Sequence, residues 1–130
     1  MISPALSRTY VWGRVTRGQG IAGRWFGFPT ANLSLATAPT LGFGVYVGWM
    51  NGPGLENNPA VICYGAGLTN GVPKFEVHLF DWSGMLEGAT VEVAIGERIS
   101  DLVPFEGEDQ MRAKIQSDVA EARQIGRAHV

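Results

Sequence analysis

The chain has 130 residues, of which 45% are apolar and 17% charged, so it has the size of one ordinary domain and enough apolar residues for a packed core. Its net charge is −2, and the absence of a basic surplus to neutralise phosphates argues against a general nucleic-acid binder. Glycine contributes 18 residues, about twice the usual ~7%, which favours a turn-rich β protein over a helical bundle.

The start of the chain and its cysteine content indicate where it works. Residues 1–10 lack the charged start and apolar run of a signal peptide. Cys63 is the only cysteine, so an internal disulfide or a cysteine metal cluster is excluded. No apolar stretch approaches the ~20 residues that cross a bilayer. We therefore expect a soluble cytoplasmic protein.

Five segments have the composition or the alternation of β-strands. They are residues 9–15, 42–50, 60–65, 74–82 and 89–95. In the fourth segment, Glu76 and His78 lie on the face opposite Phe75, Val77 and Leu79.

The connections between these segments are rich in turn-forming residues. Residues 51–59 and 66–73 are predicted to be turns. Residues 17–32 are too long for a hairpin turn, and we expect a loop there. Long loops without secondary structure in a compact domain are usually functional or disordered.

One helix is predicted, over residues 108–125. Apolar residues recur there at spacings of three and four, namely Met111, Ile115, Val119, Ala122 and Ile125. Glu108 and Asp109 lie in the first turn, where acidic side chains favour the helix dipole. Five or six strands and one helix predict an antiparallel barrel or sandwich with the helix laid across it. The pattern alone does not choose between barrel and sandwich.

The glycines of the predicted loop are candidates for phosphate binding. They let backbone N–H groups converge on an anion, and Arg24 would add a positive charge. The spacing of Gly18, Gly20 and Gly23 imitates a dinucleotide fingerprint, but no βαβ unit follows. An ordinary flexible connection is the alternative.

Two residues at the end of this loop are candidate ligands for a divalent ion. Thr30 and Asn32 lie two positions apart, so in an extended segment their side chains face the same way. A hydroxyl and an amide oxygen suit Mg²⁺ beside phosphate oxygens. The alternative is a turn in which both side chains bond their own backbone. Glu76 is a candidate base, with a solvated surface carboxylate as its alternative.

A series of motifs resembles the signature of the riboflavin kinase (flavokinase) family over residues 10–123. The most specific of them is Gly-Phe-Pro-Thr-Ala-Asn at residues 27–32. Softer matches surround it in family order: Gly13, Val15, Gly18, Gly23 and Arg24 before it, and Gly44-Val45-Tyr46, Tyr64-Gly65, Phe75-Glu76-Val77-His78-Leu79, Leu86, Gly88, Phe105, Ile115 and Asp118 after it.

The resemblance implies a mainly β fold, a six-stranded antiparallel Greek-key β-barrel with a C-terminal α-helix. It implies a single domain over residues 1–130 with its core at about 9–125. It further implies an ATP:riboflavin 5′-phosphotransferase that makes FMN and ADP with Mg²⁺ or another divalent ion. The expected partners are these small molecules, with no nucleic acid or membrane, and we expect a monomer.

The resemblance also implies roles for individual residues. The glycine-rich segment would wrap the nucleotide phosphates, through Gly18, Gly20, Gly23 and Arg24. Thr30 and Asn32 would hold the metal ion and the phosphates. Glu76 would serve as the base for the riboflavin 5′-hydroxyl, with His78 in a supporting or structural role.

One departure from the family pattern keeps other functions open. Family members carry Leu-Arg-x-Glu in a flap that precedes the helix, and here Ser100 and Leu102 replace its Arg and Glu. Arg98 could take the place of the missing arginine only if the loop shifts. The alternatives are a non-catalytic flavin- or nucleotide-binding module of the same fold, or a kinase with a changed acceptor or nucleotide donor.

Overall fold

The structure is a computed structural model that describes residues 8–16, 24–25, 28–69, 71–82, 84–104 and 106–128. Within these residues the chain forms seven strands and one helix. They are β1 (Thr9–Thr16), β2 (Arg24–Trp25), β3 (Phe28–Leu35), β4 (Gly44–Gly52), β5 (Leu55–Thr69), β6 (Val72–Leu79), β7 (Thr90–Ser100) and α1 (Glu108–Ala128).

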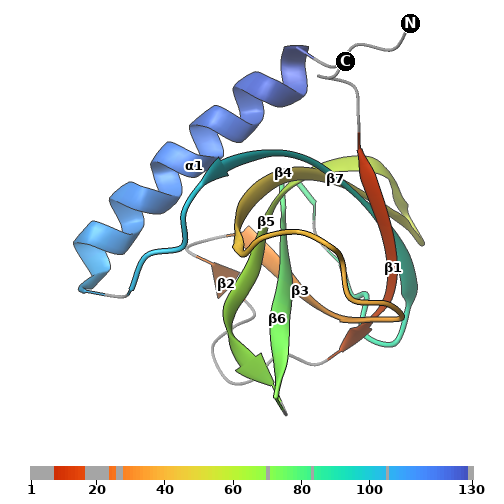
Figure 1. Ribbon diagram of the computed structural model, residues 1–130. Coiled ribbons are helices and arrows are strands. Elements are labelled where there is room, and N and C mark those ends of the chain that lie inside the picture. Colours follow the sequence, from red (N-terminus) through yellow and green to blue (C-terminus); the bar gives the residue numbers. More distant parts are fainter. Residues whose placement is uncertain are drawn as a thin grey trace, which may run out of the picture.

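Six of the strands close into an antiparallel barrel. The strand order is β1-β7-β4-β5-β6-β3, with β2 beside β3, and a pairing of β1 with β3 completes the circle (Figure 1). β4, β5 and β6 follow one another as hairpins, and β7 returns over residues 80–89 to lie beside β4. This order is a Greek key. Closure removes the exposed strand edges that an open sheet would leave, and the barrel of the sequence prediction is confirmed.

The barrel interior is one apolar core to which all six strands contribute. β1 supplies Val11 and Val15, and β3 supplies Ala31 and Leu33, at alternate positions. Val93 of β7 is fully buried in the same cluster. Because strand side chains alternate between faces, the residues between these positions point away from the interior.

A second apolar cluster lies on the outside of the barrel, beneath α1. The helix contributes Ile115, Val119 and Ala122. The strands beneath it contribute Val45, Val47, Trp49, Val61, Cys63 and Ala94, with Phe80 from the segment after β6. Figure 1 shows α1 running obliquely along the barrel. The prediction that the helix covers one side of the barrel is therefore confirmed.

The loop predicted over residues 17–32 is wrong for part of its length, because 24–25 and 28–32 are strand. β3 alternates polar and apolar residues from Thr30 to Leu35, which is a strand signal that the preceding glycines and Pro29 obscured. Pro29 is paired with Arg24 on the short β2.

The predicted turn at 51–59 shortens to residues 53–54, and the predicted turn at 66–73 is largely wrong. β5 continues to Thr69, and its register with β6 is irregular between Tyr64 and Leu68. Gly65 has a φ of 93° there, a conformation that favours glycine, and the Phe43 ring packs where a Cβ on Gly65 would lie. Glycine here therefore bends a strand instead of ending it.

Candidate active site

Antiparallel pairing of β3 with β6 brings the three candidate residues together. Thr30 is opposite His78, and Asn32 is opposite Glu76. Residues directly opposite one another on adjacent strands have Cβ atoms about 4.5–5.5 Å apart. The two oxygen donors and the candidate base therefore occupy one small patch of sheet, although 43 residues lie between Asn32 and Glu76 in the chain.

The three side chains of this patch, and His78 beside them, belong to the outer face of the barrel. Ala31 of β3 and Val77 of β6, which lie between them, are buried in the interior core. Thr30, Asn32 and Glu76 are each half-buried. The sequence prediction that Thr30 and Asn32 share a face, and that Glu76 points away from the core, is confirmed in its geometry.

β3 is held in place from both sides at this position. Thr16 of β1 is paired with Asn32, and its hydroxyl donates a hydrogen bond of 3.2 Å to the Asn32 carbonyl. β6 pairs with β3 on the other side. A site built on paired strands holds its side chains more firmly than a site on a loop.

The carboxyl group of Glu76 has an unusual environment for a strand surface. Its burial raises the pKa above the ordinary value of 4.5, and the positive charge of Lys74 opposes that shift. A carboxylate with a raised pKa is a stronger base when it is ionised near neutral pH. This environment suits proton transfer from an alcohol.

His78 is buried and bonded to Thr30. Its Nδ1 lies 2.9 Å from the Thr30 Oγ1, which is a hydrogen-bond distance. The side chain is 1% exposed, and burial lowers the pKa of the imidazole to about 3. The ring is therefore neutral near pH 7.

The patch continues sideways across the barrel toward the helix. Glu76 is opposite Cys63 of β5, Cys63 is opposite Val45 of β4, and Val45 is opposite Ser100 of β7. The Cys63 thiol is buried, which raises its pKa to about 12, and the negative charges of Glu76 and Asp118 add to the effect. The row thus links the candidate base to the strands beneath α1.

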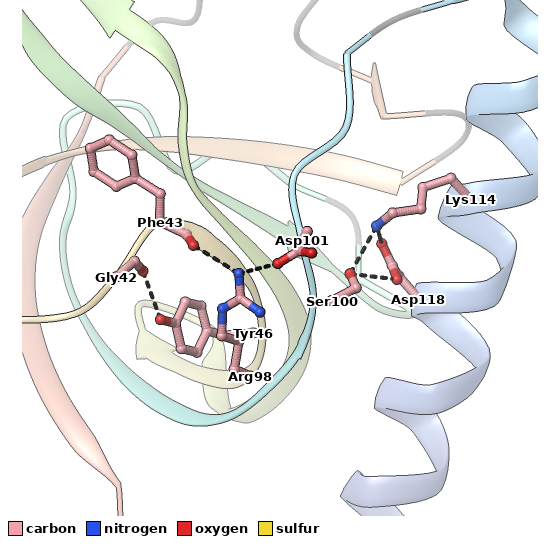
Figure 2. A network of polar contacts seen from close by, with 8 residues as sticks. All are labelled: Gly42, Phe43, Tyr46, Arg98, Ser100, Asp101, Lys114 and Asp118. Carbon is pink, nitrogen blue, oxygen red and sulfur yellow. Dashed lines mark hydrogen bonds and ion pairs between the residues drawn. The ribbon is translucent and has the colours of Figure 1, made fainter.

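The far end of this row is joined to α1 by a partly buried polar cluster (Figure 2). The Ser100 hydroxyl donates to the Asp118 carboxylate at 2.8 Å. The Lys114 ammonium lies 2.5 Å from the same carboxylate and donates to the Ser100 hydroxyl at 2.8 Å. Ser100, which departs from the family pattern, therefore joins the end of β7 to the helix.

The Arg98 side chain makes its contacts outside this cluster, with Asp101 and Phe43. Its guanidinium lies 2.6 Å from the Asp101 carboxylate and donates to the Phe43 carbonyl at 3.1 Å, as Figure 2 shows. The Tyr46 hydroxyl donates to the neighbouring Gly42 carbonyl at 2.7 Å. These contacts tie the segment before β4 to the end of β7. Arg98 thus holds two backbone segments together.

The residues on the outer face of β3 and β6 fit a divalent ion that is shared with phosphate. Mg²⁺ usually takes one or two protein oxygens together with phosphate oxygens and water. Thr30 and Asn32 offer two such oxygens, and a threonine hydroxyl has two lone pairs with which to bind a cation. Among the residues that the structure describes, no cluster of three or more His, Cys, Asp or Glu offers a metal cage. This donor set suits an ion that arrives with a nucleotide.

Part of the predicted site cannot be located. Gly18, Gly20 and Gly23 lie outside the described residues. Arg24 is placed by its backbone on β2, opposite Pro29 and hence one residue from Thr30. The predicted phosphate loop therefore stays a prediction.

The sequence analysis missed the contacts of His78 and Ser100. His78 was assigned only a supporting or structural role, and Ser100 was noted only as a replacement. A histidine two residues from a candidate base on an alternating strand was the available signal for His78. Its contact with Thr30 depends on the register of two strands, which no local pattern reports.

The comparisons with known proteins agree with the fold. A family model described as Flavokinase, riboflavin kinase, matches residues 6–126. The chain is 35% identical over 115 residues to the bifunctional riboflavin kinase/FMN adenylyltransferase of Haemophilus influenzae, covering 87% of this chain and 37% of that protein. It is 34% identical over 118 residues to the Escherichia coli protein of the same description, covering 87% and 36%. The chain thus spans little more than a third of these relatives.

Two solved structures resemble the chain as well. A crystal structure described as a macrolide-efflux protein from Streptococcus pneumoniae matches with a TM-score of 0.77 and 30% identity, covering 90% of this chain and 39% of that one. Riboflavin kinase from Trypanosoma brucei matches with a TM-score of 0.63 and 23% identity, covering 92% and 81%. Among the described residues, no helix has the length and apolarity needed to cross a membrane.

Proposed function

This chain belongs to the riboflavin kinase family, and we propose that it transfers the γ-phosphate of ATP to the 5′-hydroxyl of riboflavin, giving FMN and ADP. The observation that carries the proposal is the register of β3 and β6. It sets Thr30 and Asn32 beside Glu76 on one outward face. A motif match by itself would not require these side chains to meet.

Each residue has a role that phosphoryl transfer needs. Thr30 and Asn32 would hold a divalent ion and the phosphates, and the backbone from Gly18 to Arg24 would wrap the nucleotide. The ion, Mg²⁺ in our proposal, would neutralise charge on the phosphate oxygens. Glu76 would accept the proton of the riboflavin 5′-hydroxyl as its oxygen attacks the γ-phosphorus and the bond to ADP breaks. The raised pKa of Glu76 supports this role.

The test is FMN formation by the purified chain with riboflavin and Mg·ATP, followed by chromatography. We expect Glu76→Gln to lower kcat/KM by about 10²–10⁴-fold, the range typical of removing a general base. We expect Thr30→Val to lower it by about 10–100-fold, because the metal site is weakened. Glu56→Gln is the matched control, because Glu56 is an exposed carboxylate on β5, and we expect it to retain activity. Full activity in Glu76→Gln would reject the role of Glu76 as the base. Flavin or nucleotide binding without FMN would instead favour the non-catalytic module.

We also propose the finer features that the composition suggests. The chain would act as a monomeric single domain on small molecules and not on nucleic acid, because its charge is slightly negative. A cytoplasmic location is supported by the single buried cysteine, which a reducing compartment preserves. Light scattering of the purified chain tests the oligomeric state.

A further inference from the structure

We propose that His78 is a positioning residue for the metal and phosphate site: its Nδ1 accepts the hydrogen of the Thr30 hydroxyl and so turns the Oγ1 lone pairs outward. The inference rests on the proposed function, because Thr30 matters here as a ligand. In this proposal His78 does not touch the substrate, and it acts on the site through Thr30.

The geometry is specific to this pair. His78 and Thr30 are directly opposite each other on β6 and β3, and the Nδ1 and Oγ1 atoms are 2.9 Å apart. The imidazole is buried at 1% exposure, whereas Thr30 is half-buried at the outer face. The ring therefore lies beside the hydroxyl on the outer face and is the more deeply buried of the two.

The chemistry of a hydroxyl explains what such a partner contributes. A threonine hydroxyl has one hydrogen to donate and two lone pairs. To bind a cation through a lone pair it must direct its hydrogen elsewhere, and a neutral imidazole nitrogen is a good acceptor. An outer partner of this kind typically changes metal affinity or activity 10–100-fold when it is removed.

The surroundings of His78 make a purely apolar role a poor explanation. On the other side of His78, β5 presents Val61, which is fully buried. A valine or leucine would fill that environment without the cost of burying a polar ring. The hydrogen bond from Nδ1 to Thr30 offsets part of that cost.

A double-mutant cycle tests the coupling. The variants are His78→Leu, Thr30→Val and the pair, and the readouts are Mn²⁺ binding in the presence of ADP, followed by electron paramagnetic resonance, and kcat/KM for Mg·ATP. We expect each single change to weaken both by about 10–100-fold. The double variant should lie within about threefold of Thr30→Val. Losses that multiply would overturn the proposal.

His78→Asn is the matched rescue, because its side-chain oxygen can take the place of Nδ1 as an acceptor. We expect it to bind Mn·ADP within about fivefold of the unchanged chain, whereas His78→Leu does not. Equal losses in the two variants would contradict an acceptor role. This comparison separates hydrogen bonding from packing.

A measurement on the unchanged chain keeps the inference testable if the variants fail to fold. Nitrogen-15 NMR of the full chain with labelled histidine reports which ring nitrogen of His78 carries hydrogen. We expect hydrogen on Nε2 and a bare Nδ1. Hydrogen on Nδ1 would reject the proposal whether or not the chain makes FMN. Lack of FMN together with a bare Nδ1 would reject the proposed function but leave the hydrogen bond intact.

Discussion

Cys63 lies in the middle of the outward row, between the candidate base and the strands beneath α1, and its side chain is 6% exposed. Burial is the main cause of its pKa of about 12, and the nearby carboxylates of Glu76 and Asp118 add to it, whereas Lys114 opposes it. The thiolate is the reactive form of cysteine, and the raised pKa keeps that form scarce at pH 8. Cys63 is therefore chemically inert in the folded state.

We expect native protein at pH 8 to react with a thiol-specific disulfide reagent at least about 100-fold more slowly than protein in concentrated urea, because burial removes both access and ionisation. Since Cys63 is the only cysteine, the measured absorbance change belongs to it alone. Stoichiometric labelling of the native chain within minutes would contradict the described burial.

The candidate site was predictable at some positions and not at others. Thr30 and Asn32 share a face in any extended segment, so their common direction could be predicted from their spacing. Glu76 could be placed opposite the core by the alternation of β6. The contact between Thr30 and His78 could not be predicted, because it joins residues 48 positions apart through the register of two strands.

Among the elements, β3 and β7 show where local pattern misleads. Glycine and proline before Thr30 indicated a loop, yet pairing with β1 and β6 holds the segment as strand. β7 extends beyond the predicted residue 95 to Ser100, past Gly96 and two charged residues that break its apolar alternation. In both cases hydrogen bonds to neighbouring strands outweigh the propensity of the segment.

The attachment of α1 to the barrel leads to a prediction at this scale. The Asp118 carboxylate is buried, with 6% of its side chain exposed, and accepts hydrogen bonds from Ser100 and Lys114. Asp118→Ala would leave the Lys114 ammonium, 21% exposed, without its nearest negative charge. We expect this change to lower the free energy of unfolding by up to about 3 kcal/mol, measured by urea denaturation.

Replacing both charges separates the attraction from the packing. The double variant Lys114→Met with Asp118→Leu keeps the volume and removes the unpaired charge, so we expect it to be more stable than Asp118→Ala alone. Asp109→Ala is the control, because Asp109 is an exposed carboxylate in the first turn of the same helix. If the double variant were less stable than Asp118→Ala, the cluster would not act as an ion pair.

For the whole molecule, the alternation of the strands is compatible with a barrel or with a sandwich, and the choice depends on one pairing. Gly13 to Thr16 of β1 pair with Asn32 to Leu35 of β3, which converts an open sheet into a closed one. Residues of β1 and β3 belong to separate predicted segments, and no local pattern connects them. Closure is thus a property of the assembled sheet.

His78, a fully buried titratable group, contributes to the pH dependence of folding stability. The pKa of His78 is lowered from 6.5 to about 3 in the folded state, so between these values the unfolded chain binds a proton that the folded chain excludes. The stability from this group is complete above about pH 6.5 and falls as pH drops toward 3, by up to about 1.4 kcal/mol per pH unit. The pKa of Glu76 is raised in the folded state. The folding stability that this group contributes is therefore present below about pH 4.5 and is lost as the pH rises.

Urea denaturation between pH 7.5 and 4.5, without divalent ions, measures this effect. We expect the unchanged chain to lose stability progressively below pH 6.5, and His78→Leu to show a flatter profile because leucine takes up no proton. The other titratable groups, Glu76 included, are common to both proteins, so the difference between the two profiles isolates His78. Parallel profiles would mean that His78 titrates alike in both states, and that water reaches its ring in the folded chain.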